Sequence, residues 1–312
     1  MRAIALSSST LREAVRRAAP TRHRSASSSV LPVSTSASGN SINVMTGNKY
    51  QPEEDMAALP GVLGLEIVRH YNSRYSGSDA MPGLLGRGWK LSYETELAIG
   101  NQTLQVFQAN GSSLIFNRDL LNPARAAGAS PANGSIAIRR NRQGGGEYVW
   151  RWTDGRELSF DKRGKLMQIR VATGEVFSLL HDARGLLVKV TDPQGRSLRL
   201  VYPERHEAGG VRFRGVRAIE SPVGRFDYEH DNTAGAAQRA RIANLVRVRY
   251  PGGDEGRQYH YEDAAQPSYL TGISIAGAAA PGRPAIRHYA PPTPTRRTAR
   301  QCCRRTPTIS TR

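Results

Sequence analysis

Cysteine is almost absent from this chain: among its 312 residues only Cys302 and Cys303 occur, side by side. Adjacent cysteines rarely bond to one another, and there is no second pair, which argues against a disulfide framework and a cysteine zinc site. Long apolar runs are also missing, since no segment approaches the roughly 18 apolar residues of a membrane-spanning helix. Residues 3–6 are too short for the apolar core of a secretory signal peptide, so we expect no such signal.

Acidic residues are scarce at both ends of the chain. Residues 1–50 hold seven basic residues and one acid, and residues 281–312 hold eight arginines and no acid. These ends supply 14 of the 18 net positive charges, which leaves +4 on residues 51–280. Because the excess charge lies in segments without interleaved aromatic residues, we do not expect nucleic acid as a partner; binding through the two ends stays an alternative.

Motifs for catalysis, cofactors and metals are missing as well. The seven histidines form no His-x-His or His-x-x-x-His pair, so zinc-ligand spacing is absent from the sequence. Residues 144–146 lack the Lys-Ser/Thr of a phosphate loop, and residues 272–277, which resemble a nucleophile elbow, precede no helical pattern. Asp192-Pro193 falls inside a repeated turn, where both residues set backbone angles. We therefore predict that the chain is not an enzyme and has no catalytic residue, cofactor or metal site.

Turn-forming residues are abundant instead. The 31 glycines and 18 prolines punctuate short segments in which apolar and polar residues alternate, as they do in half-buried β-strands. Residues 62–71 and 89–95 show this alternation. Asn110-Gly111 between two apolar segments is a strong hairpin signal, because both residues tolerate positive φ. The sequence therefore predicts an all-β fold.

A repeat begins near Tyr148. Each unit combines a glycine turn, an alternating strand, a second turn and a short strand, and Gly155, Gly174 and Gly195 follow one another at steps of 19 and 21 residues. A single β-hairpin is marginally stable in water, so the units must stack on their neighbours. We expect about five units in an elongated sheet that grows hairpin by hairpin.

Three blocks before the repeats carry a more specific pattern. Residues 43–47 (Asn-Val-Met-Thr-Gly) precede residues 69–73 (Arg-His-Tyr-Asn-Ser) and residues 85–89 (Leu-Gly-Arg-Gly-Trp). In order and spacing, these blocks and the glycine repeats resemble the RHS/YD-repeat family, whose RHS core opens with a domain of the DUF6531 type. Ser41 stands where the family usually has proline, which affects one turn. The resemblance covers about residues 40–276. The residues that match its structural motifs are Asn43, Thr46, Gly47, Arg69, Tyr71, Asn72, Ser73, Gly86, Gly88 and Trp89.

The resemblance implies four segments and a fold. We expect a disordered Ser/Arg-rich segment over residues 1–39, the opening domain of the RHS core over 40–147, hairpin repeats over 148–277 and a disordered basic tail over 278–312. In this family stacked β-hairpins form an open, spiralling β-sheet shell, and we expect part of such a shell here. Because a closed shell needs more units than these, we expect a truncated fragment. We also expect the reading frame to be shifted from about residues 278–290 onward.

The same resemblance implies a structural role. Family shells enclose or present a C-terminal toxin, so we expect a shell fragment of the bacterial toxin-delivery or cell-surface type that lacks the toxin. The implied partners are the remainder of the shell, a toxin domain and components of a secretion system, and the implied destination is the cell surface or beyond. The alternative is a carbohydrate-binding module, in which aromatic residues of the repeats would stack on sugar rings instead of packing in the interior. These residues are Trp150, Trp152, Phe160, Tyr202, Phe213, Phe226, Tyr228, Tyr250, Tyr259 and Tyr261.

Overall fold

The structure is a computed structural model that describes residues 42–43, 48–77, 80–140, 146–203, 213–232, 241–253, 256–276 and 287–288. These residues form β-strands and two short 3-10 turns, η1 (Ser73–Tyr75) and η2 (Pro131–Asn133). Within the described ranges, no helix has the length and apolar character needed to cross a membrane. Residues 1–39, most of the tail 278–312, and the motif residues Thr46 and Gly47 lie outside the described ranges.

Four strands near the N-terminus form a small antiparallel sheet, which we call the N-terminal sheet. In order across the sheet they are β1 (Ile42–Asn43), β2 (Asn48–Met56), β3 (Ile67–Asn72) and β4 (Trp89–Leu91). Strand β4 pairs with β3 so that Leu91 faces Arg69 and Trp89 faces Tyr71. All four of these side chains belong to residues that are at most 1% exposed, so one face of the sheet is buried.

The remaining strands form one continuous antiparallel ladder, the repeat sheet. Its first strands are β5 (Glu96–Ile99), β6 (Thr103–Phe107), β7 (Ser113–Arg118), β8 (Arg125–Gly128), β9 (Ser135–Arg140) and β10 (Gly146–Arg151). Next come β11 (Glu157–Phe160), β12 (Leu166–Arg170), β13 (Val176–His181), β14 (Leu187–Thr191), β15 (Ser197–Val201) and β16 (Ala218–Ser221). The last are β17 (Gly224–His230), β18 (Leu245–Arg249), β19 (Gly256–His260), β20 (Gly272–Ala276) and β21 (Arg287–His288). Each strand pairs with the next in the chain, which confirms the predicted growth by hairpins.

Five successive hairpin turns have the same hydrogen-bond pattern. In each, the first residue donates to the carbonyl of the fifth, and a glycine in fourth place donates to the carbonyl of the first. The turns are residues 152–156, 161–165, 171–175, 182–186 and 192–196. Their glycines have φ between +78° and +103°, a region that favours glycine, as expected for a turn followed by a left-handed residue. This confirms that Asp192 belongs to a repeated turn.

The same turn also occurs before the predicted start of the repeats. Gln108 and Ser112 close it, and Gly111 holds the fourth place with φ +90°. The predicted hairpin at Asn110-Gly111 is therefore confirmed. The repeat sheet runs through the expected boundary at residue 147, which lies inside β10; the division into two domains stays a prediction. Strand β21, inside the expected tail, extends the sheet past residue 277 through its pairing with Gly272 and Ile273.

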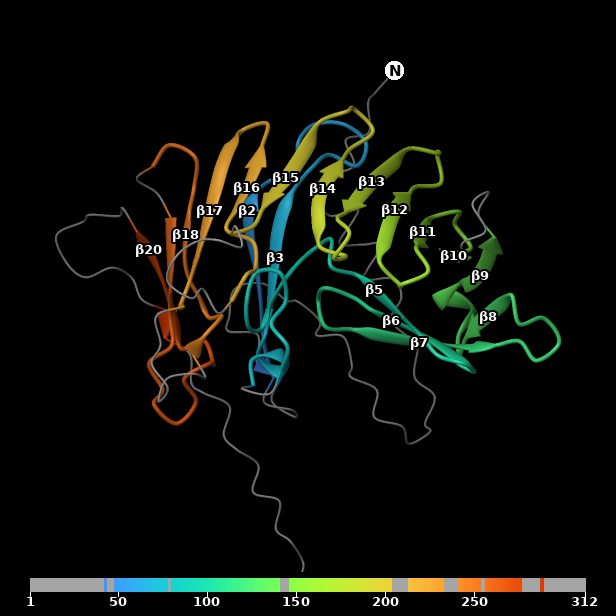
Figure 1. Ribbon diagram of the computed structural model, residues 1–312, viewed down its shortest axis with the longest axis horizontal. Helices are drawn as coiled ribbons and strands as arrows, with labels where there is room; N and C mark the ends of the chain where they lie inside the picture. Colours follow the sequence, from blue (N-terminus) through green and yellow to red (C-terminus); the bar gives the residue numbers. More distant parts are fainter. Residues whose placement is uncertain are drawn as a thin grey trace, which may run out of the picture.

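The repeat sheet bends back on itself near its beginning. The amide of Leu97 in β5 donates to the carbonyl of Gly164 (2.9 Å), and Glu96 forms a single antiparallel bridge with Lys165. The free edge of β5 thus meets the turn between β11 and β12, while β13–β21 continue beyond this contact. Figure 1 shows β8–β10 at the bend, with β5–β7 on the lower side and β11–β14 on the upper side. No ladder between β5 and β21 exists among the described residues, so the sheet stays open, as predicted for a spiralling shell.

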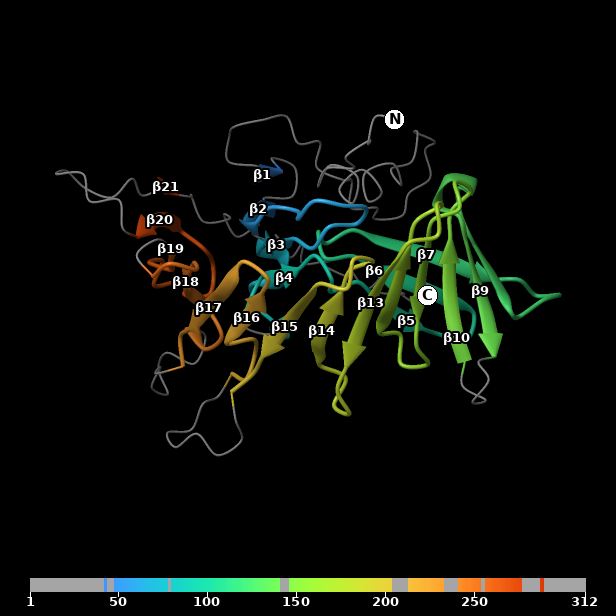
Figure 2. The ribbon, with the colours of Figure 1, turned by 90° about the horizontal axis from the view of Figure 1, so that it is seen from above.

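The core lies between the N-terminal sheet with β5–β7 on one side and the repeats on the other (Figures 1 and 2). Phe160, Phe177 and Val190 from the repeats share this core with Trp89 and Leu104. The N-terminal sheet therefore packs against the inner face of the repeats. The structure confirms the predicted fold class of stacked β-hairpins.

Candidate functional site

The most unusual group in the interface between the two sheets is a buried ion pair. Arg69 in β3 donates to Asp55 in β2 through Nε (2.6 Å to Oδ2) and Nη2 (2.7 Å to Oδ1), and both side chains are 0% exposed. The pairing register of β2 shifts between Glu54 and Met56, so Asp55 is the extra residue of a bulge. Bulges re-aim side chains, which explains how a carboxylate on β2 meets the guanidinium fork of Arg69.

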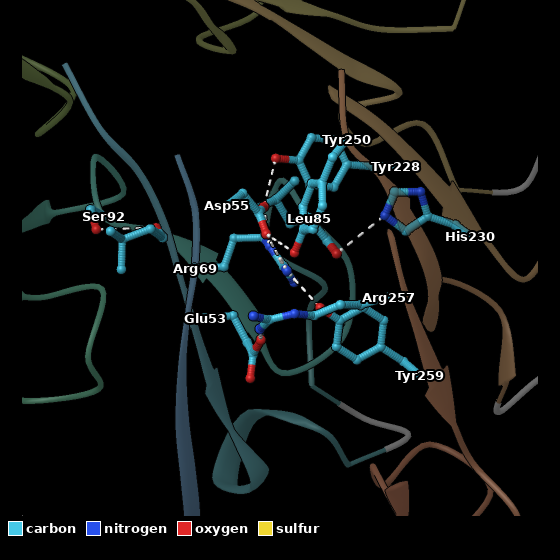
Figure 3. Close-up of polar contacts among 11 residues, drawn as sticks. Glu53, Asp55, Arg69, Leu85, Ser92, Tyr228, His230, Tyr250, Arg257 and Tyr259 are labelled. Atoms are coloured by element: carbon cyan, nitrogen blue, oxygen red, sulfur yellow. Dashed lines mark hydrogen bonds and ion pairs between the residues drawn. The ribbon is translucent and has the colours of Figure 1, made fainter. Parts of the chain in front are cut away.

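Three tyrosines of the repeat sheet complete the group. Arg69 Nη2 donates to the hydroxyl of Tyr259 in β19 (2.6 Å), and the hydroxyl of Tyr228 in β17 donates to Asp55 Oδ2 (2.9 Å). Tyr250, which follows β18, donates to Asp55 Oδ1 (3.3 Å). Figure 3 shows these side chains converging from both sheets. We call Asp55, Arg69, Tyr228, Tyr250 and Tyr259 the Arg69 cluster.

Within this cluster Arg69 stays charged and the tyrosines stay neutral. Burial alone would lower the pKa of Arg69, but the neighbouring Asp55 carboxylate outweighs it and holds that pKa well above its usual range, so the guanidinium stays charged. Burial, reinforced by Asp55, raises the pKa of Tyr228 well above 10. Burial likewise raises the pKa of Tyr259. The phenols therefore stay protonated, and Tyr228 can donate to the carboxylate at any physiological pH.

Aromatic rings surround the guanidinium on the same interface. The Arg69 Cζ atom lies 4.7 Å from the ring centre of Trp89 and 5.2 Å from that of Tyr259, distances at which cation–π attraction operates. Trp89 and Tyr259 also contact each other edge to face at 5.1 Å. Beside this group, Glu53 forms an ion pair with Arg257 of β19. The interface thus combines a buried ion pair with aromatic rings that pack around it.

Two further hydrogen bonds tie the N-terminal sheet to the end of the repeats. Trp89 Nε1 donates to the Tyr261 hydroxyl (3.3 Å), which itself donates to the Leu245 carbonyl (3.0 Å). The Leu270 amide donates to the hydroxyl of Tyr71 (2.9 Å). These contacts join residues of β3 and β4 to segments more than 170 positions later in the chain. The motif residues Tyr71 and Trp89 therefore act at the interface between the sheets.

The turn before β4 docks on the repeats through its backbone. Gly86 has φ +102°, and a Cβ atom there would lie 2.3 Å from the Ala243 carbonyl oxygen. Arg87 donates from its amide to Ala243 (2.9 Å) and from Nε to the carbonyl of Ile242 (2.9 Å). Gly88 has φ +72°, and its Cβ would collide with Ser76 Oγ at 2.2 Å. Gly86 is thus required by the close approach of a backbone carbonyl, and Gly88 by the close approach of the Ser76 and Tyr71 side chains.

The motif residues Asn72 and Ser73 shape the end of β3. The Asn72 side chain accepts from the Arg74 amide (3.1 Å) and so caps η1. The Ser73 hydroxyl accepts from the Lys49 amide (2.9 Å) and donates to Asn48 Oδ1 (3.0 Å). The Ser73 contacts hold β2 and β3 together, and the Asn72 side chain also donates to the carbonyl of Asn110 (3.4 Å) in the turn between β6 and β7 of the repeat sheet.

The structure brings Arg69, Tyr71, Gly86 and Trp89 together at one interface, whereas Asn43 lies in β1 and pairs with Asn48 of β2. No sequence pattern indicates that Asp55 is their partner. The tyrosines of the repeats were expected either to pack in the interior or to stack on sugar rings. Asp55 carries no motif of its own, and its partners Tyr228 and Tyr250 stand 173 and 195 residues away.

The segment that resembles a nucleophile elbow lies in a strand. Ser274 is in the middle of β20, is 3% exposed, and shares a hydrogen bond of 2.8 Å with His260 Nε2 on the paired strand. The elbow requires a strand-to-helix turn, and among the described residues no helix follows β20. The described residues also hold no cluster of three or more His, Cys, Asp or Glu side chains that could bind a metal ion.

The candidate sugar platform is inside the core. Trp150 and Trp152 are 1% and 9% exposed, and their rings lie 3.8 Å apart. Trp150 Nε1 donates to the carbonyl of Asn133 (2.7 Å), and Phe116 contacts the same ring edge to face. The interior-packing interpretation of these aromatic residues is confirmed.

The fold and the interface define a class: a β-hairpin repeat protein whose own N-terminal sheet packs inside its repeats. Comparison with known proteins agrees with this description. Residues 39–116 match a family model described as a domain of unknown function (DUF6531). The chain is also 30% identical over 212 residues to the Toxin protein Tse5 of Pseudomonas aeruginosa, a match that covers 57% of this chain and 15% of that protein. Together these matches support the assignment of the chain to the RHS/YD-repeat family.

Proposed function

We propose that this chain is a structural segment of an RHS-type shell that serves toxin delivery or the cell surface, and that it is not an enzyme. The family assignment and the likeness to Tse5, whose name describes a toxin protein, support this proposal. The matched region is 15% of the length of Tse5, so the segment would form only part of a larger shell. Its partners would be further shell repeats, a toxin domain and secretion-system components.

The observation that carries the proposal is the Arg69 cluster. It joins β2 and β3 to β17 and β19, which are separated from them by most of the described chain. An open antiparallel sheet has no intrinsic reason to adopt one fixed curvature, whereas a rigid sheet docked on its inner face selects one. The N-terminal sheet would thus set the curvature of the first turn of the shell.

A test replaces Arg69 with methionine in the full chain and follows amide hydrogen exchange. We expect faster exchange in β17–β19, because their inner face loses its charged anchor, while β11–β13 keep their protection. Arg199→Met is the control, since Arg199 lies in β15 of the repeat sheet, where its side chain is 72% exposed. Unchanged exchange in β17–β19 of the folded variant would refute the curvature-setting role.

Tyr250→Phe gives a milder variant in case Arg69→Met does not fold. It removes one hydroxyl that donates to Asp55 at 3.3 Å, from a half-buried residue. We expect the same regional pattern of exchange with a smaller increase.

The delivery role is tested in the bacterium that encodes the chain. Deletion of the gene should reduce killing of neighbouring cells, and the wild-type chain should restore it while Arg69→Met should not. Killing that is unaffected by the deletion would argue against toxin delivery and leave the structural role to the exchange experiment.

A further inference from the structure

The connection between β7 and β8 ends in two leucines that nothing covers. Leu120 and Leu121 are 95% and 97% exposed, more than any other large apolar residues described. Figures 1 and 2 both show this connection extending past the sheet, at the end of the molecule opposite to β20. Full exposure of two adjacent leucines is costly in water, so their placement needs a reason.

The leucines are presented by an ordered turn. Asp119 Oδ1 accepts from the amides of Leu121 (2.8 Å) and Asn122 (3.3 Å), and the Asn122 side chain accepts from the Ala124 amide (3.2 Å). The Asp119 amide donates to the Arg125 carbonyl, and the Arg125 amide donates to the Asn122 carbonyl, both at 2.9 Å. The two leucines therefore cannot fold back onto the sheet without breaking this network.

Positive charge gathers at the base of the turn. Arg125 pairs with Ala137 in the ladder between β8 and β9, which places Arg139 beside the turn on the same face. Both arginines are exposed, and neither forms an ion pair within the described ranges. Arg118, at the end of β7, pairs with Ala126 and donates to the carbonyls of Gly100 and Pro123 (each 3.2 Å). The acids beside these arginines are Asp119, whose carboxylate is bound within the turn, and Glu147, opposite Arg139 in the ladder.

We propose that this turn, which we call the dileucine tip, inserts into the surface of an anionic lipid bilayer. Leu120 and Leu121 would enter the acyl region, while Arg125 and Arg139 would contact the phosphates above it. Two protruding leucines with arginines behind them match a bilayer surface, in which the acyl region lies beneath the phosphates of the headgroups. An apolar groove on a partner protein could bind the two leucines without any need for arginines beside them. The proposal goes beyond the shell function and does not depend on it.

Tryptophan at the tip reports insertion directly. The native Trp89, Trp150 and Trp152 are buried, so their emission should not respond to lipid. We would compare Leu121→Trp with Leu180→Trp, whose native leucine is 55% exposed on β13, in the full chain. The vesicles are phosphatidylcholine with roughly one-third phosphatidylglycerol, with and without brominated acyl chains. We expect brominated lipid to quench Trp at position 121 and not at position 180.

A binding measurement separates insertion from the attraction of the basic chain ends. High salt screens that attraction but not apolar burial. Under high salt, Leu120→Ser with Leu121→Ser should weaken vesicle binding at least about tenfold, while the control Leu180→Ser should not change it. Arg125→Gln with Arg139→Gln should weaken binding to anionic vesicles at low salt and leave binding to pure phosphatidylcholine unchanged.

Three results would overturn the proposal: equal quenching at positions 121 and 180, no effect of the serine variants, or a blue shift at position 121 that depends on protein concentration without lipid. The last result would identify a second copy of the chain as the occupant of the tip. Near-ultraviolet circular dichroism of each variant checks that the fold is kept.

Discussion

Removal of the Asp55 carboxylate should be among the most damaging single changes in this chain. Asp55→Ala takes two charge-assisted hydrogen bonds from Arg69 and an acceptor from each of Tyr228 and Tyr250. Arg69, at 0% exposure, is then a buried charge without a counter-ion. Breaking a buried pair in this way costs about 3–5 kcal/mol. Each phenol that loses its acceptor adds about 1 kcal/mol or more.

The expected total, about 5–7 kcal/mol, is comparable with the whole stability of an ordinary domain, roughly 5–15 kcal/mol. Urea unfolding followed by tryptophan fluorescence measures it, since Trp89 lies against Arg69. We expect Asp55→Ala to unfold at much lower urea than the wild type, or to be unfolded without urea.

The double variant Asp55→Ala with Arg69→Met tests whether the loss of stability comes from the uncompensated charge of Arg69. It removes the uncompensated charge, so most of the lost stability should return and only the cost of the phenols, about 2 kcal/mol, should remain. A double variant as unstable as the sum of the two single variants would show that the loss comes from packing and not from the buried charge. A loss below about 1 kcal/mol for Asp55→Ala would show that the pair is worth no more than a surface ion pair.

Three further outcomes are expected from other parts of the molecule. Gly88→Ala should lower the melting temperature more than Gly174→Ala, because both positions have positive φ but only a Cβ at Gly88 meets another atom within 4 Å. Burial raises the pKa of Glu94 from 4.5 to about 7 against two backbone hydrogen bonds that lower it. The folded state thus favours the protonated acid, so its contribution to stability is full below pH 4.5 and is lost as the pH rises through about 7. Urea midpoints across this range should fall more steeply for the wild type than for Glu94→Gln. Arg196→Lys should speed hydrogen exchange in the connection between β2 and β3 and cost about 1 kcal/mol, since a lysine cannot bond both Asp192 and the Pro60 carbonyl as Arg196 does.

Features that depend on neighbouring residues could be predicted from the sequence. The hairpin turns are local, and a glycine in fourth place is required by the backbone angle alone. The alternation of strands follows from the same short-range pattern. For this reason the all-β class, the repeats and the hairpin at Asn110-Gly111 all agree with the structure.

Features that join distant segments could not be predicted in the same way. Arg69 and Trp89 belonged to recognisable blocks, but no local pattern indicates that Arg69 meets Tyr259 or that Leu97 meets Gly164. The role of Asp55 could not be predicted, because its side chain is turned inward by a bulge that no sequence pattern indicates. Sequence patterns therefore indicate the residues that the N-terminal sheet contributes to the candidate site, but not their partners in the repeats.

The distance between the two halves of the Arg69 cluster has a consequence for synthesis on the ribosome. Arg69 and Tyr259 are separated by 190 residues. At about 5–20 residues per second, the N-terminal sheet would wait about 10–40 s before its last partner strand is made. During this interval Arg69 is solvated, while the rings of Tyr71 and Trp89 lack their final cover. Slow translation would prolong the exposure of these rings, so the demand for chaperone protection should fall on the earliest part of the chain.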